Sequence, residues 1–331
     1  MGFIVDRRLA CLDALRGIAV VLMFFGHFLR YLMTDPFSSQ IHYAMYLLSR
    51  LSAPMFLVLA GICLVLSSKK RLVRQKKADV LKHHILRGVF LFFMGFAFNL
   101  IMLEPLFTLN SLHSIGLSII LLSPIALKPT TIKCLILALA VLFLSEEAYR
   151  HDRISAVLIL FQAPMFPWII FAIIGVYAGM FFTQYRSDPL KVFVHIGVLS
   201  SLLILCGVLL NYTGTSIIWG QRPSTSFIAI AAGSSIYLGA MLLFVFRIMH
   251  KKFPVFMPIA AFGRHALVMY FAHGIFLTEV VNLLGLKNKL TESYALLVLV
   301  LYIIASWVII WYIEGKILKT RYKKDVETYN P

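Results

Sequence analysis

Long apolar segments recur along this 331-residue chain, and they constrain its fold more than any other feature. The chain is 60% hydrophobic and its apolar runs are continuous rather than alternating, which excludes a transmembrane β-barrel. Each run has roughly the 20 residues that a helix needs to cross a bilayer. The sequence therefore predicts an all-α, polytopic integral membrane protein with about ten transmembrane helices, at 9–31, 42–66, 84–103, 111–127, 132–147, 157–183, 191–211, 224–247, 257–280 and 293–315.

The net charge of +17 is distributed unevenly between the predicted loops. Most lysines and arginines fall before the first span, in the loop 67–83, in the later loops on the same side, or in the tail 316–331. The positive-inside rule then puts both termini in the cytoplasm. We interpret the charge as a topology signal that attracts membrane lipids, and we expect no nucleic-acid partner. The basic loop 67–83 could also concentrate a polyanionic cytosolic ligand.

The first span carries three polar side chains, Asp13, Arg16 and His27. Such groups are rare inside spans, and by default they indicate a functional site that faces protein or water. Arg16 and His27 are separated by about three helical turns, so they share one helix face about 16 Å apart along the axis. Asp13 and Arg16, at i and i+3, can form an ion pair. The pair could be purely structural, or it could belong to a site.

Other polar side chains mark later spans. Arg50 needs a partner at its depth, which could be a structural clamp or a substrate oxygen. His113 is expected at the outer level that His27 reaches, whereas Arg264 is expected near the inner surface and His273 deeper. His42 begins the second span and Asn99 lies within the third.

The spacing of these side chains narrows the chemistry. Metal sites on helices use histidines and carboxylates at i, i+3 or i+4, and no span contains such a pair, so we expect no metal. The G-x-S-x-G motif of α/β-hydrolases is absent as well. A lone imidazole on a polar stripe remains, and it can act as a general base or become acylated itself.

The first span resembles the R-x10-H motif of the transmembrane acyltransferase superfamily, through Asp13-Ala14-Leu15-Arg16-Gly17 and His27. That superfamily includes the acyltransferase-three family and the heparan-α-glucosaminide N-acetyltransferase family. The chain is most similar to the second family, in segments that follow the same order along nearly the whole chain: SRLSAPMF at 49–56, LHSIG at 112–116, FPW at 166–168, and GRHAL at 263–267 followed by His273.

The resemblance implies a single transmembrane acyltransferase domain over residues 1–331. Such an enzyme would move an acyl group, most simply acetyl, from cytosolic acetyl-CoA or another acyl-CoA to a hydroxyl or amine across the membrane. The acceptor would be a glycan or a lipid-linked sugar. The implied roles are catalytic for His27, Asp13 and His113, cofactor-binding for Arg16, Arg264, His273 and Trp168, and substrate-binding for Arg50, Asn99 and His42.

A transporter or flippase for a polar or anionic small molecule is the alternative, with the same polar stripe as its permeation path. It would favour inverted repeats and matching broken helices, and we find no convincing repeat. The short loops favour a bacterial cytoplasmic membrane, and the sequence is compatible with a homodimer.

Overall fold

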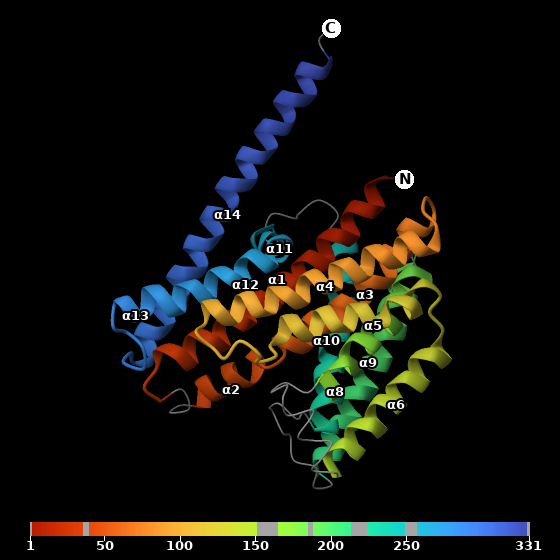
Figure 1. The fold of residues 1–331 in the computed structure, drawn as a ribbon, viewed down its shortest axis with the longest axis horizontal. Helices are drawn as coiled ribbons and strands as arrows, with labels where there is room; N and C mark the ends of the chain where they lie inside the picture. Colours follow the sequence, from red (N-terminus) through yellow and green to blue (C-terminus); the bar gives the residue numbers. More distant parts are fainter. Residues whose placement is uncertain are drawn as a thin grey trace. The chain divides into compact units, whose positions relative to one another are not determined.

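The computed structural model describes residues 2–35, 40–150, 165–184, 188–212, 224–248 and 257–329, and side chains over a narrower part of these ranges. Within them the regular structure is helical, apart from one isolated bridge between Met33 and Leu290 (Figure 1). This confirms the predicted all-α class. The chain divides into two compact units, Met1–Ser49 with Lys251–Pro331, and Arg50–His250, and each is described by itself.

The first unit is built around α1 (Gly2–Leu32), the red helix in Figure 1. Its apolar core includes Leu15, Phe24 and Phe28, each no more than 1% exposed. The helix packs against the other elements of this unit, which are α2 (Gln40–Ser49), α11 (Met257–Arg264), α12 (Ala266–Ile275) and α14 (Glu292–Tyr329). The π-helical turn η2 (Phe276–Val280) and α13 (Val281–Leu283) continue directly from α12.

The loop before α14 closes the C-terminal end of α1. The last carbonyl groups of a helix have no partner within it, so they need donors from elsewhere. The amide of Asn288 donates to the Tyr31 carbonyl at 3.0 Å, and the amide of Leu290 donates to the Leu32 carbonyl at 2.9 Å. The ammonium of Lys287 lies 4.8 Å from the centre of the Tyr31 ring. These contacts hold the end of α1 that carries His27.

The second unit contains seven described helices, and the backbones of α3 and α8 approach closely where Gly61 meets Gly175. Small residues allow this approach between membrane helices. The helices are α3 (Ser52–Leu72), α4 (Lys77–Ile101), α5 (Ser111–Leu127), α6 (Thr131–Arg150), α8 (Met165–Gln184), α9 (Pro189–Tyr212) and α10 (Thr225–Ile248). The main pairs are α9 with α10, α3 with α8, and α4 with α5.

Eight helices in the described part of the chain are long and apolar enough to cross a membrane. The expected spans 111–127 and 132–147 are instead the shorter apolar helices Ser111–Leu127 and Thr131–Leu144. The expected start of the sixth span, 157–164, lies outside the described residues. Many large apolar side chains on α9 and α14 are exposed, as lipid-facing surfaces require.

The structure differs from the predicted spans and loops in four places. The second span is interrupted at Arg50 and Leu51, between α2 and α3, because Pro54 in the first turn of α3 has no N–H to donate to the Arg50 carbonyl. The ninth is interrupted at His265, whose ψ of 24° is not helical. The basic segment 67–83 is helical except at 73–76, because it contains no Gly or Pro and its lysines and arginines favour helix. The tail 316–331 continues α14 as helix to Tyr329.

Candidate active site

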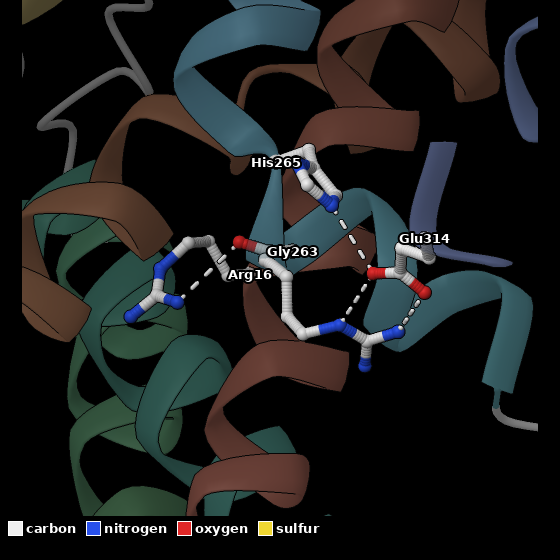
Figure 2. A network of polar contacts seen from close by, with 5 residues as sticks. Arg16, Gly263, His265 and Glu314 are labelled. Carbon is white, nitrogen blue, oxygen red and sulfur yellow. Dashed lines mark hydrogen bonds and ion pairs between the residues drawn. The ribbon is translucent and has the colours of Figure 1, made fainter. Parts of the chain in front are cut away.

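Asp13 and Arg16 connect α1 to α11 within the first unit. Arg16 Nη1 donates to Asp13 Oδ1 at 2.7 Å, so the ion pair that the spacing predicts is present. The same nitrogen lies 3.4 Å from the carbonyl oxygen of Gly263, the contact drawn in Figure 2. The Arg16 and Asp13 side chains remain 25% and 19% exposed. The pair is therefore partly buried and also bridges two helices that are far apart in the sequence.

Two glycines allow α1 and α11 to approach this closely. A Cβ atom at Gly17 or at Gly263 would overlap the backbone of the opposite helix. Each glycine is next to an arginine, because Gly17 follows Arg16 and Gly263 precedes Arg264. The close contact therefore fixes the backbone from which both guanidinium groups extend.

His27 pairs with His273 of α12. His27 Nδ1 lies 2.9 Å from His273 Nε2, and His273 Nδ1 lies 3.2 Å from the Met269 carbonyl oxygen. His273 is fully buried, with the rings of Phe24 and Tyr270 at 5.7 and 5.5 Å, whereas His27 is exposed. One imidazole is therefore embedded in the unit and holds a second, accessible one.

The contacts of Arg16 and His27 confirm that both lie on one face of α1. Arg16 reaches Gly263 and His27 reaches His273, so both side chains face the segment that runs from the end of α11 into α12. The helix between them is uninterrupted. The predicted separation of about 16 Å along the axis follows from its regular rise.

Glu314 joins Arg264 and His265 in a network that the sequence did not reveal (Figure 2). Arg264 donates from Nε and Nη2 to the two carboxylate oxygens of Glu314, each at 2.8 Å. His265 Nε2 lies 3.1 Å from Oε1 of the same carboxylate. The planar guanidinium thus binds the carboxylate in the bidentate geometry that it also uses for phosphate. A carboxylate at a span end is common, so nothing singled out Glu314 in advance.

In the second unit Asn99 and His113 belong to a network at the start of α5. Asn110 caps this helix. Its side-chain oxygen Oδ1 accepts from the backbone N–H of Leu112 at 2.9 Å, and its backbone N–H donates to His113 Nδ1 at 3.0 Å. Asn110 Nδ2 donates to Asn99 Oδ1 at 2.8 Å. Asn99 and His113 are almost completely buried, and His113 Nε2 has no hydrogen-bond partner. Their side chains thus hold the α4–α5 turn together.

The remaining predicted residues have simpler surroundings. Trp168, in α8, packs its ring 5.6 Å from Phe171 and 6.4 Å from Phe227 of α10. Arg50 lies in the break before α3 and is partly exposed. The side chain of His42 lies outside the described residues. Arg50, Asn99, His113 and Trp168 belong to the second unit, whereas Asp13, Arg16, His27, Arg264 and His273 belong to the first.

The fold and the site define a helical integral membrane protein with an imidazole pair and two ion-paired arginines, Arg16 and Arg264. Among the residues that the structure describes, no three His, Cys, Asp or Glu side chains gather closely enough to hold a metal ion.

Residues 8–212 match the family model described as heparan-alpha-glucosaminide N-acetyltransferase, catalytic. The match covers more than half of the chain, so this protein belongs to that family of membrane acetyltransferases, as its resemblance predicted. The matched stretch contains Asp13, Arg16 and His27, and it ends before Arg264 and His273. A search of curated proteins found no match for this chain.

Proposed function

We propose that this protein takes an acetyl group from cytosolic acetyl-CoA and passes it to a hydroxyl or amine of a glycan or lipid-linked sugar on the far side of the membrane. The observation that carries the proposal is the accessible imidazole of His27. This residue lies on α1, inside the family match, and His273 holds its ring. Family membership supports transferase activity. We propose the acetyl donor, the acceptor and the role of His27 in addition to this activity.

His27 can act in two ways. As a general base, it takes the proton of the acceptor hydroxyl or amine while the acceptor attacks the thioester carbonyl. As an acyl carrier, it attacks the carbonyl itself and then passes the acetyl group on. In the first route the acceptor bonds to the acetyl carbon, the C–S bond breaks, and the proton that His27 took from the acceptor passes to the leaving CoA sulfur. In the second route a His27 nitrogen bonds to the acetyl carbon as the C–S bond breaks and CoA leaves as a thiolate. The acceptor then attacks the acetyl carbon, the C–N bond to His27 breaks, and the proton of the acceptor passes to the CoA thiolate.

We assign donor binding to Arg16 and Arg264. Guanidinium groups bind phosphate through paired hydrogen bonds. The approximately 16 Å between Arg16 and His27 along α1 suits a ligand held by its phosphates at one end, with its thioester presented at the other. The lysines and arginines of segment 67–83 would raise the local concentration of the polyanionic donor.

The Nε–Nη2 edge of Arg264 can bind a phosphate only if Glu314 yields. Glu314 occupies the Nε and Nη2 donors that a phosphate would use. The two side chains are 36% and 26% exposed, so the pair is screened by solvent and is weak enough to exchange. We therefore propose that the donor phosphate displaces the carboxylate.

The orientation and surroundings follow the charge pattern. We propose cytoplasmic termini in a bacterial cytoplasmic membrane, with acyl-CoA approaching from the cytosol and lipids around the spans. Asp13, His113, Trp168, Arg50, Asn99 and His42 keep their predicted roles as hypotheses, as do the single acyltransferase domain over 1–331 and the homodimer.

A transporter or flippase is the second candidate, favoured by the two interrupted helices. Breaks at Arg50 and at His265 resemble the discontinuous helices that line transporter binding sites. A transporter would move its substrate without consuming a thioester, which separates the two functions experimentally.

Binding and turnover of acetyl-CoA by detergent-purified protein test the proposal. We expect wild type to bind and consume it, His27→Ala to bind without turnover, and Arg16→Ala to lose binding. His195→Ala, at an exposed position on α9, and Arg30→Ala, at the other end of α1, are the matched controls. If wild type neither binds nor consumes CoA thioesters, the enzyme assignment is wrong, and uptake by proteoliposomes becomes the decisive assay.

A further inference from the structure

A chain of three groups leads from the backbone of α12 to His27. It begins at the Met269 carbonyl oxygen, which can only accept hydrogen bonds. His273 Nδ1, 3.2 Å away, must therefore carry the hydrogen of that bond. In a neutral imidazole one ring nitrogen donates and the other accepts, so His273 Nε2 is left as the acceptor.

The second bond of the chain then determines the state of His27. His27 Nδ1 lies 2.9 Å from His273 Nε2, and since Nε2 accepts, Nδ1 must donate. A neutral His27 with its hydrogen on Nδ1 has its lone pair on Nε2. We propose that His273 is a positioning residue that holds His27 in this tautomer, with Nε2 as the basic, nucleophilic nitrogen. The inference rests on the proposed function.

The surroundings of His273 support this assignment. Its side chain is 0% exposed, and the rings of Phe24, Tyr270 and His27 lie within 5.7 Å of its own. Burying a charged imidazolium in such a setting is costly, which favours the neutral ring that the hydrogen-bond chain requires. A protonated His273 would donate from both nitrogens and would force the opposite tautomer on His27.

The position along α12 also matters. The bond to Met269 comes from one turn earlier in the same helix, so it turns the imidazole along the helix surface toward α1. The π-helical turn η2 begins three residues after His273, and such turns often occur at functional sites. A positioning role for His273 differs from the cofactor contact that the resemblance implies for it.

The tautomer of His27 tests the inference directly. In protein labelled with ¹⁵N-histidine, we expect the His27 signals, identified by their loss in His27→Ala, to show a protonated Nδ1 and an unprotonated Nε2. His273→Leu should abolish this preference. His273→Gln should retain it, because an amide oxygen can accept from His27 while the amide nitrogen donates to Met269.

Kinetics separate positioning from donor binding. For His273→Leu we expect kcat to fall by about 100-fold, the scale of general-base catalysis, with acetyl-CoA affinity unchanged. His273→Gln should stay within a few-fold of wild type. Melting temperature and elution profile identify any variant that fails to fold, and for such a variant the tautomer in wild type still decides.

Two results would overturn the inference. One is a wild-type His27 protonated at Nε2, and the other is a His273→Leu variant that weakens acetyl-CoA binding while kcat is unchanged. The tautomer is measured without substrate. A wild-type protein with the expected tautomer that consumes no acetyl-CoA would therefore refute the proposed function and leave the role of His273 intact.

Discussion

Replacing Glu314 with glutamine tests whether a donor phosphate must displace Glu314 to bind Arg264. The wild-type carboxylate receives two hydrogen bonds of 2.8 Å from Arg264 and lies 3.1 Å from His265 Nε2. Glutamine keeps the shape and one acceptor oxygen, but it removes the charge and turns an NH₂ group toward a donor. The guanidinium therefore loses most of its competing partner.

The expected change in acetyl-CoA affinity follows from the solvent exposure of the Arg264–Glu314 ion pair. Arg264 and Glu314 are 36% and 26% exposed, and ion pairs that reach solvent contribute at most about 1 kcal/mol. If a donor phosphate must displace Glu314, that energy opposes binding, and removing it should lower the Kd for acetyl-CoA by about fivefold. The same loss should lower the melting temperature slightly.

Isothermal titration of acetyl-CoA into detergent-purified Glu314→Gln, compared with wild type, measures this shift. Glu292→Gln, at the opposite end of α14, is the matched control and should bind as wild type does. Arg264→Gln should weaken binding in either background. If Glu314→Gln is less stable but binds acetyl-CoA with unchanged affinity, the Arg264–Glu314 pair is a structural clamp and the exchange mechanism is wrong.

Three further predictions concern packing, capping and topology. Gly263→Ala should destabilise the protein by about 1–3 kcal/mol through overlap with α1, and its melting temperature should fall. Gly197→Ala is the control, because Gly197 has open space around it and its variant should melt as wild type does. Equal melting temperatures for the two variants would contradict the close contact between α1 and α11. Asn110→Ala should lower the free energy of unfolding by about 1–2 kcal/mol, because it uncaps α5 and removes the hydrogen bond to Asn99. Thermal unfolding measures this, with Asn211→Ala as the control, and unchanged stability of Asn110→Ala would refute the capping role. In a cysteine-free background, Lys287→Cys in intact cells should react with an impermeant maleimide and Lys70→Cys should not, and the reverse pattern would invert the topology.

The sequence predicted α1 and its polar stripe well, for a physical reason. Charged groups in a span are conspicuous, and helical periodicity alone relates Asp13, Arg16 and His27. The ion pair lies within one turn of one helix, so no tertiary information was needed. The structure confirms the helix over the first span and the ion pair between Asp13 and Arg16.

The partners of these residues could not be predicted. His273 and Gly263 reach α1 from roughly 250 residues away, and only the packing of α11 and α12 on α1 brings them there. Glu314 was missed because carboxylates at span ends ordinarily meet solvent. The break at His265 has no Pro beside it, so the ninth span reads as one continuous helix although it is two.

Sealed native membrane vesicles, with the cytoplasmic face outward, test the central claim most directly. ¹⁴C-acetyl-CoA added outside should label material in the vesicle interior when wild-type protein is present. His27→Ala should reduce that label by at least about 100-fold, with His195→Ala as the control. Interior labelling that is the same for wild type and His27→Ala, or no labelling by wild type, would contradict transfer across the membrane through His27.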